Sequence, residues 1–219
     1  MSNLFKDNIK KSQYSDLIKK LRKSIEDGEE SLKLLLFGTL NLNLYSEHGD
    51  YKEGQHNKCN GLKKDTFTEK RLCKCMYYYN NLFQKNCDKC DFKQRYKLTG
   101  NYEICDYEVP AFYYGDGIGE IDVIIKGKET VYATEIKPYK GNNETLLRMI
   151  SEIMTYTLGY PNEKYKKAIA FFENTPQEKE YLSMTSEMKA LIKEADITVF
   201  RFEKIDEATY TICKLYDEQ

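Results

Sequence analysis

The chain has 219 residues, of which 41% are hydrophobic, and its 34 basic residues nearly cancel its 35 acidic ones. This length suffices for one sizeable domain with an insertion, and a net charge of −1 does not by itself indicate a class of partner. No apolar run approaches the ~20 residues that a membrane span needs, and the N-terminus has no hydrophobic signal core. We therefore expect a cytoplasmic protein with no membrane partner, in which the seven cysteines are reduced thiols or metal ligands rather than disulfides.

The first quarter of the chain is predicted to be mainly helical. Apolar residues recur at helical spacing over 13–26, near a Ser/Asp cap, and Gly28 separates this helix from a second one over 30–45. A strand is the alternative for NLNLY at the end of that second stretch. Residues 46–60 are polar and contain glycines, which indicates a loop. We assign residues 1–54 to the N-terminal helices of a larger core.

The next stretch, residues 55–98, is interpreted as a basic insertion rich in cysteine. Between Lys58 and Lys97 there are eleven Lys or Arg residues and four acidic ones, a charge of +7 that leaves −8 for the rest of the chain. Tyrosine and phenylalanine are interleaved with these basic residues, a pattern that suits stacking on unpaired bases and contact with phosphates. We expect a small basic loop without a core of its own, which a bound metal would fold.

Four cysteines of this stretch have the spacing of a metal site. A C-x-C pair is followed, after eleven residues, by a C-x-x-C pair, and four thiolates at this spacing suit one structural zinc ion. An iron–sulfur cluster and unliganded thiols are the alternatives, and His56 with Cys59 is a substitute ligand pair. The four predicted ligands are Cys73, Cys75, Cys87 and Cys90.

Residues 119–137 carry charged groups within two apolar strands joined by a turn. Asp122 lies in the first strand, and Glu135 and Lys137 share one face of the second because side chains alternate along a strand. A tight turn would pair Asp122 with Ala133, whereas a loop two residues longer would place Asp122 opposite Glu135. Either register leaves the two carboxylates roughly 5–8 Å apart on one face, which suits a hard cation such as magnesium.

The rest of the chain alternates between strands and helices, which predicts an α/β fold with a central mixed sheet flanked by helices. A strand over 166–173 follows a helix over 144–158, so we expect that strand to run parallel to its predecessor. Arg148, Glu152 and Tyr156 line one side of the helix at i, i+4 and i+8. The elements predicted after the insertion are strands at 102–114, 119–126 and 130–138, the helix at 144–158, a strand at 166–173, a helix at 176–194, and strands at 197–204 and 208–215.

Asp122, a hairpin and then Glu135-x-Lys137 resemble the motif of the PD-(D/E)xK nuclease superfamily. The segment EVPAFYYGDGIGEID at 108–122 is most similar to the RecB-like branch, which includes CRISPR-associated and AddB-type exonucleases. The resemblance covers about residues 100–175.

That branch usually carries Gln-x-x-x-Tyr on the following helix, and Glu152-x-x-x-Tyr156 stands in the equivalent place. The resemblance implies a restriction-endonuclease-like core over 99–219, with the cysteine-rich segment as an insertion. It also implies a magnesium-dependent deoxyribonuclease whose partner is single-stranded or duplex DNA.

The implied mechanism is metal-assisted hydrolysis of phosphodiester bonds. Asp122 and Glu135, with the backbone carbonyl of Ile136, would hold one or two Mg²⁺ or Mn²⁺ ions that activate a water molecule. Lys137 would orient that water or help to deprotonate it, and would stabilise the transition state. Glu152 and Tyr156 would support the lysine or touch the DNA backbone.

Glu108, in the preceding strand, is a further candidate metal ligand. The chain departs from the family pattern at two places: Ile121 replaces the usual proline, and Leu42 stands where a metal-binding histidine would follow the Gly38-Thr39 step. These departures leave room for an endonuclease of the restriction or structure-specific kind.

Two other functions stay open at the level of sequence. One is a non-catalytic nucleic-acid-binding protein that uses a zinc-stapled basic insertion, and the other is an interaction protein in which the insertion is a docking arm. A homo-oligomer and an unidentified partner protein are both compatible with the sequence.

Overall fold

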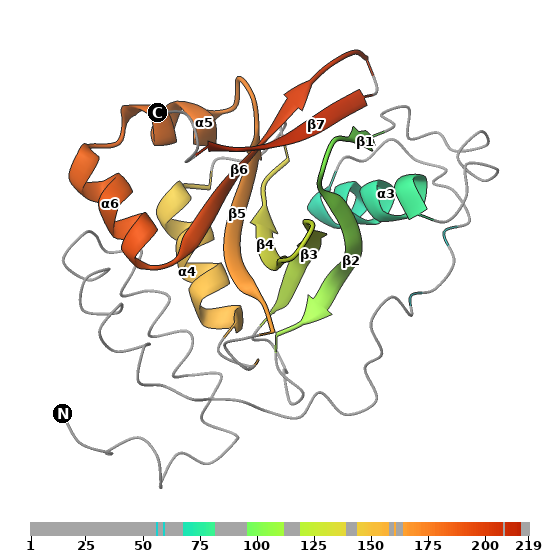
Figure 1. Ribbon diagram of the computed structural model, residues 1–219, viewed down its shortest axis with the longest axis horizontal. Helices are drawn as coiled ribbons and strands as arrows, with labels where there is room; N and C mark the ends of the chain where they lie inside the picture. The colour runs from blue at the N-terminus through green and yellow to red at the C-terminus, as the bar shows by residue number, and fades with distance from the viewer. Residues whose placement is uncertain are drawn as a thin grey trace, which may run out of the picture.

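The computed structural model in Figure 1 describes residues 56, 59, 68–81, 96–111, 119–138, 144–157, 160, 164–207 and 209–215. The predicted helices within 1–54 lie outside these residues. The described residues form an α/β fold around one seven-stranded mixed sheet, which confirms the predicted fold class at that level. The strands are β1 (Lys97–Thr99), β2 (Glu103–Pro110), β3 (Glu120–Lys126), β4 (Val131–Ile136), β5 (Lys166–Phe172), β6 (Ile197–Lys204) and β7 (Thr209–Lys214). The described helices are α3 (Glu69–Asn81), α4 (Leu146–Tyr156), α5 (Pro176–Ser183) and α6 (Ser186–Glu194).

The strands follow the order β1-β7-β6-β5-β4-β3-β2 across the sheet. β2, β3 and β4 pair antiparallel, whereas β5 pairs parallel to both β4 and β6. Helix α4 connects β4 to β5, so the predicted parallel crossover is confirmed. The sequence pattern located all the strands from β2 onward to within a few residues, but it did not predict β1.

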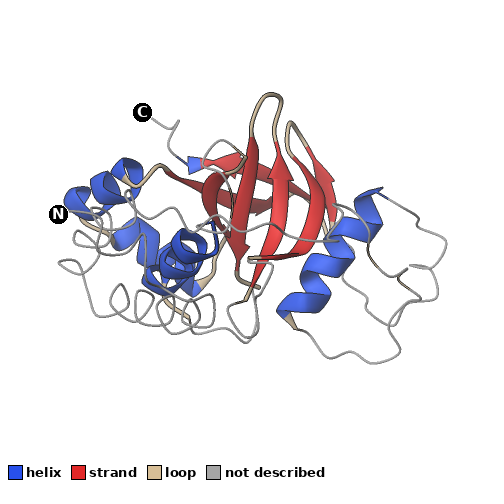
Figure 2. Cartoon of the chain, turned by 90° about the horizontal axis from the view of Figure 1, so that it is seen from below, coloured by secondary structure: helices blue, strands red, loops and turns tan. Residues whose placement is uncertain are grey.

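The sheet is curled, and its two edge strands approach each other (Figure 2). β1 and β2 stand at opposite ends of the strand order, yet only residues 100–102 join them in the chain. Gly100 has a φ of 100°, which is a conformation that glycine adopts readily. Tyr102 then packs edge-on against Phe200, with 5.0 Å between ring centroids, and against Tyr132 at 6.4 Å. Aromatic rings from distant strands therefore fill the curl.

Helix α3 packs against β1, β2 and β3 on the face of the sheet that also carries these rings. Its residues Leu72, Cys73, Met76 and Tyr77 are buried, at the i, i+1, i+4, i+5 spacing of one helical face. The interpretation of this stretch as a loop without a core is therefore wrong for residues 69–81, because a helix there buries an apolar face on the main sheet.

Asn80, near the end of α3, ties the helix to the edge strand β1. Its side-chain nitrogen donates to the carbonyl of Tyr96, and its side-chain oxygen accepts from the backbone nitrogen of Leu98, both at 2.8 Å. The amide thus satisfies one backbone group of β1 and one of Tyr96, the residue directly before it.

Helices α4, α5 and α6 lie on the opposite face, as Figure 2 shows, over a second apolar core. The single helix predicted over 176–194 is two helices. Met184 is extended, and the side chain of Thr185 accepts a hydrogen bond from Met188 and begins α6 as an N-cap. Among the described residues, no helix is long and apolar enough to cross a membrane.

Candidate metal centre

The strands β3 and β4 separate at the point where the predicted acidic residues stand. Ile124 pairs with Ala133, which is the register of the longer loop, and the ladder continues only to the pair Val123–Thr134. Beyond that pair, the side chain of Asp122 accepts a hydrogen bond of 2.9 Å from the backbone nitrogen of Ile136. A carboxylate thus takes the place of a backbone acceptor, and it is fixed at the fork between the two strands.

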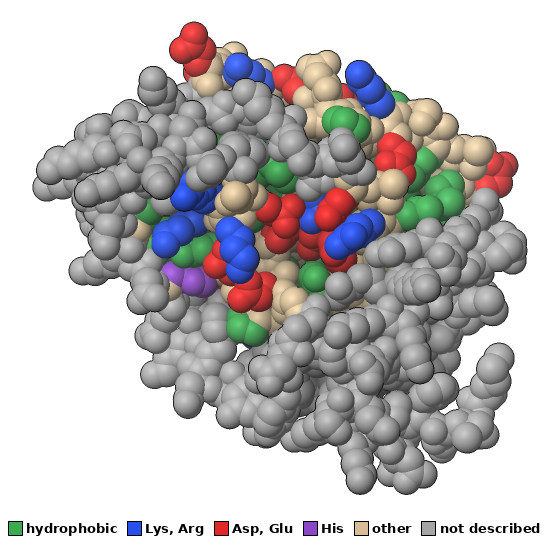
Figure 3. All heavy atoms as spheres, turned by 180° about the vertical axis from the view of Figure 1, so that it is seen from behind, with side chains coloured by type: hydrophobic (Ala, Val, Ile, Leu, Met, Phe, Trp, Pro, Cys, Tyr) green, Lys and Arg blue, Asp and Glu red, His purple; other side chains and the backbone are tan. Residues whose placement is uncertain are grey.

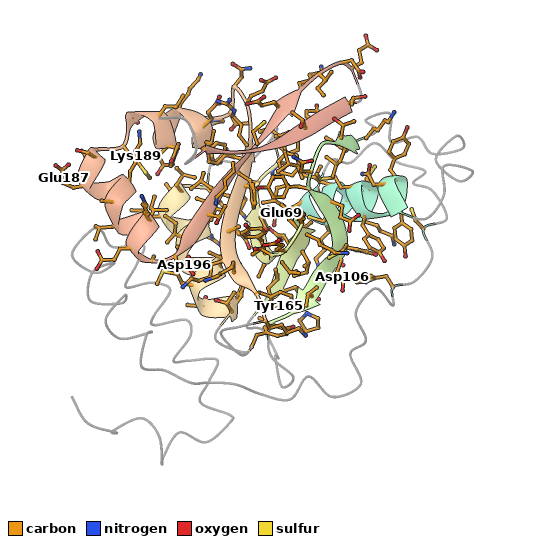
Figure 4. All side chains as sticks on the ribbon, in the orientation of Figure 1. Glu69, Asp106, Tyr165, Glu187, Lys189 and Asp196 are labelled. Carbon is orange, nitrogen blue, oxygen red and sulfur yellow. The ribbon has the colours of Figure 1, made fainter. Side chains whose placement is uncertain are left out.

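Glu69 joins Asp122 and Glu135 at this fork. Each of the three offers a carboxylate oxygen, and these oxygens all lie within 4.8 Å of one another. Glu69 is the first residue of α3 and lies beside β3 and β4 (Figure 4). Two strands and a helix from another part of the chain therefore bring three oxygen donors together, and the set suits a hard cation such as Mg²⁺ or Mn²⁺.

The ammonium group of Lys137 contacts two of these carboxylates and two further ones. Its nitrogen is 2.6 Å from Glu135, 3.0 Å from Glu69, 3.0 Å from Glu144 and 3.6 Å from Glu152. The side chain is 3% exposed. Four carboxylates share one buried cation, so negative charge exceeds positive charge around it.

Arg148 supplies a second positive charge, at the surface. Its Nε atom is 3.4 Å from both Glu144 and Glu152. Even with both cations included, the five carboxylates leave a formal excess of three negative charges. Figure 3 shows acidic side chains gathered on this face of the molecule, with Lys and Arg side chains on either side.

The electrostatics of the carboxylates reflect this excess. Burial, together with repulsion from Glu69, raises the pKa of Asp122 to about 7. Burial and the charge of Asp122 raise the pKa of Glu135 well above its usual range, and burial also raises the pKa of Glu69. Burial alone would lower the pKa of Lys137, but the carboxylates around it, Glu135 first, raise it above its ordinary value. At neutral pH the lysine is therefore an ammonium ion.

Glu135 presents one buried carboxylate oxygen at the fork that no described residue contacts by a hydrogen bond. Glu135 is 2% exposed, and its Oε2 atom has no hydrogen-bond partner among the residues that the structure describes. A buried acceptor without a donor costs about 1–3 kcal/mol, and more when it is charged. A divalent cation held by Glu69, Asp122 and Glu135 would satisfy this oxygen and offset part of the excess charge.

The other two residues predicted on α4 lie in different surroundings. Glu152 is buried and reaches Lys137, as predicted for a residue that supports the lysine. Tyr156 is buried one turn further on, where its hydroxyl packs over Gly119, so closely that a Cβ at 119 would come within 2.3 Å of it. Gly119 has a φ of 130° and directly precedes β3. Tyr156 therefore packs against the residue from which the strand of Asp122 begins.

The candidate ligands outside the fork are placed as follows. Glu108 is half-buried on β2, level with Asp122, and 3.9 Å from Lys70. Cys73 is buried in the α3 core, and Cys75 is partly buried on the same helix, where residues two apart point to different sides. Cys87 and Cys90 lie outside the described residues, so the four-cysteine site stays a prediction. The carbonyl of Ile136 as a metal ligand also stays a prediction. The backbone N–H of the same residue donates a hydrogen bond to Asp122.

Glu69 and Glu144 are the residues of the site that the sequence pattern did not identify. A helix beginning at Glu69 could have been recognised from the Thr68 cap, whose side chain accepts from Arg71, and from the buried stripe that follows. Nothing in the sequence shows that this helix begins beside Lys137, 68 residues further along the chain.

The chain matches no protein-family model, no curated protein and no solved structure.

Proposed function

We propose that the chain is a metal-dependent nuclease that hydrolyses phosphodiester bonds of DNA at the Asp122–Glu135 fork. The observation that carries the proposal is the convergence of Glu69, Asp122 and Glu135 beside a buried Lys137, with one oxygen of Glu135 left without a partner among the described residues. The order of two antiparallel strands, a helix and a parallel strand around this site is also the order that the resemblance implies.

The donor set supports Mg²⁺ or Mn²⁺ rather than a soft metal, because all three ligand atoms are carboxylate oxygens. When bound, such an ion lowers the pKa of a coordinated water and neutralises charge on the phosphate. Glu69, Asp122 and Glu135 would hold it.

The other residues of the site act on the water and the phosphate. In the reaction the water oxygen forms a bond to phosphorus and releases a proton to solvent, one P–O ester bond breaks, and the departing oxygen takes a proton from solvent. Lys137 orients the water and stabilises the negative charge that builds on the phosphate. Glu152 and Glu144 hold the ammonium of Lys137 in place, and Arg148, which is 45% exposed, is available to a phosphate of the DNA backbone.

A cleavage assay with a matched pair of variants tests the proposal. Single-stranded and duplex DNA are incubated with the purified chain in Mg²⁺, in Mn²⁺ and in EDTA. We expect cleavage that requires the divalent ion and falls at least roughly 10²–10³-fold in Glu135→Gln, since this change removes a charge aimed at the reacting centre. Glu103→Gln is the control, because Glu103 is an exposed glutamate of β2 that pairs with Lys126 at 3.2 Å.

Two results would count against the proposal. Equal activity in the wild type and Glu135→Gln would remove the assigned site. Salt-sensitive DNA binding without cleavage in either ion would favour the alternative, a non-catalytic nucleic-acid-binding protein built on the basic cysteine-rich segment.

A further inference from the structure

Lys70 holds a second group of carboxylates next to the fork. It follows Glu69 in α3, and its ammonium nitrogen is 3.0 Å from Glu120 and 3.9 Å from Glu108. It also interacts electrostatically with Asp122. Lys70 is therefore a second positive charge near the fork, paired with Glu108 and Glu120, whereas Lys137 pairs with Glu69 and Glu135.

The backbone of β2 brings Glu108 into this second group. The pairs Tyr107–Val123 and Val109–Ile121 flank it, so Glu108 is level with Asp122 across the β2–β3 ladder. Glu108 has a φ of 47°, which is uncommon for a residue other than glycine. Its side chain is 28% exposed, and one carboxylate oxygen lies 3.9 Å from the ammonium nitrogen of Lys70.

The carboxylates at the fork thus form two groups that share Asp122. The inner group, Glu69 and Glu135, contains the Glu135 oxygen that has no hydrogen-bond partner within the described part of the chain. The outer group, Glu108 and Glu120, already surrounds a positive charge of the chain itself. In two-metal phosphoryl-transfer sites, one ion acts at the attacking oxygen and a second ion, about 3.5–4 Å away, acts at the leaving oxygen.

We propose that Lys70 supplies the positive charge that a second divalent ion supplies in two-metal sites, so that the chain binds a single catalytic ion. This inference rests on the proposed function and assigns its leaving-group side. The side chain of Lys70 is 72% exposed, so its ammonium is accessible to a phosphate of a bound nucleic acid. Its charge then stabilises the departing oxygen, while Lys137 and the inner ion act at the attacking water.

The number of bound ions tests this inference without any need for cleavage. Mn²⁺ is titrated into the wild type and into Lys70→Ala, and the bound ions are counted by calorimetry and by electron paramagnetic resonance. We expect one Mn²⁺ per chain in the wild type, and a second, weaker one in Lys70→Ala, where Glu108 and Glu120 are freed. Glu108→Gln in the Lys70→Ala background should remove the second ion and keep the first.

Lys126→Ala is the matched control. Lys126 is also an exposed lysine paired with one glutamate, Glu103, at the opposite end of β3 from Asp122. The Lys126→Ala variant should bind one Mn²⁺, as the wild type does. Exposed pairs of this kind contribute little to stability, so neither lysine variant should unfold.

The outcomes separate the two proposals. Two ions in the wild type, or one ion in both the wild type and Lys70→Ala, would overturn the role of Lys70 and leave the inner site intact. No bound Mn²⁺ in any variant would overturn this inference together with the proposed function. In a cleavage assay, loss of rate in Lys70→Ala with a change from first-order to second-order dependence on Mg²⁺ would support the role of Lys70.

Discussion

Lys137 and Arg201 each lie among glutamates, but the pKa of a neighbouring glutamate shifts in opposite directions in the two clusters. Arg201 contacts Glu203 through its Nε atom at 2.9 Å and Glu178 through Nη1 at 3.4 Å, and its hydrogen bond lowers the pKa of Glu203. Around Lys137, four carboxylates share one ammonium, and burial raises the pKa of Glu135.

Under the proposed function, this difference separates a structural ion pair from a metal site. Glu178 of the Arg201 cluster also accepts a hydrogen bond from the backbone nitrogen of Asn174, before α5. Glu173, which follows β5, accepts one from the backbone nitrogen of Lys204. In the Lys137 cluster, by contrast, Glu135 keeps a buried oxygen without a partner among the described residues. A surplus of buried negative charge is costly, and a bound cation offsets it.

The largest effect that we expect is on stability, from removing the cation at the centre of the acidic cluster. Lys137→Met should lower the unfolding free energy of the metal-free chain by about 3–5 kcal/mol, because buried carboxylates lose their counter-charge. Arg201→Met should cost less, since the 21% exposed side chain leaves its glutamates accessible to water. Urea denaturation in EDTA measures both changes. An equal loss in the two variants would remove the distinction between the clusters.

The second largest effect is stabilisation by a divalent ion. At a free Mg²⁺ or Mn²⁺ concentration of 100 times Kd, binding to the folded state adds about 2.7 kcal/mol, or roughly 5–11 °C in Tm for a chain of this size. Glu135→Gln should abolish the increase, whereas Glu203→Gln in the Arg201 cluster should keep it. Thermal denaturation with and without the ion provides the measurement. A Tm increase that persists in Glu135→Gln would place the ion elsewhere.

A third effect concerns pH. Asp122 has a pKa of about 7 in the folded chain and about 3.9 when unfolded, so the folded state holds a proton that the unfolded state has lost between these values. The unfolding free energy of the metal-free chain should therefore fall as pH rises from about 4 to about 7. Glu203 has the opposite effect: because its pKa is lowered in the folded state, its contribution to the unfolding free energy is lost as pH falls. Denaturation in EDTA at pH 5 and pH 8 tests this, and Asp122→Asn should flatten the dependence. A metal-free chain that is more stable at pH 8 than at pH 5 would contradict it.

The smallest effect belongs to the Arg201 cluster itself. Glu203→Gln should cost about 1 kcal/mol or less, because the 30% exposed carboxylate is screened by water. DNA cleavage should be unchanged in this variant. A large loss of activity there would mean that the Arg201 cluster takes part in the function.

The arrangement of Asp122, Glu135 and Lys137 on neighbouring strands could be predicted from sequence. The approach of Glu69 to these residues could not. Alternation along the strands places Asp122, Glu135 and Lys137, and the longer of the two predicted registers is the one observed. The cysteine spacing and basic charge of residues 58–97 predict a metal-bound loop, whereas the apolar stripe in the same segment forms α3. This helix carries Glu69 and Lys70 to the fork. That placement depends on the curl of the sheet, which no local pattern encodes.

Of the four cysteines predicted to bind a metal, Cys73 and Cys75 lie within the described residues. Cys73 is buried among Leu72, Met76 and the neighbouring tyrosines, as expected of a small hydrophobic side chain in a core. A C-x-C pair within a helix does not by itself converge on one ion. The partners Cys87 and Cys90 lie outside the described residues, so zinc and an iron–sulfur cluster both stay predictions.

Diffraction from crystals of the chain soaked in Mn²⁺ tests the central claim most directly. The account predicts an anomalous peak at the fork of β3 and β4, about 2.0–2.2 Å from oxygens of Asp122 and Glu135 and within reach of Glu69. A well-ordered fork without such a peak, with Lys137 still bound to all four carboxylates at saturating Mn²⁺, would contradict it.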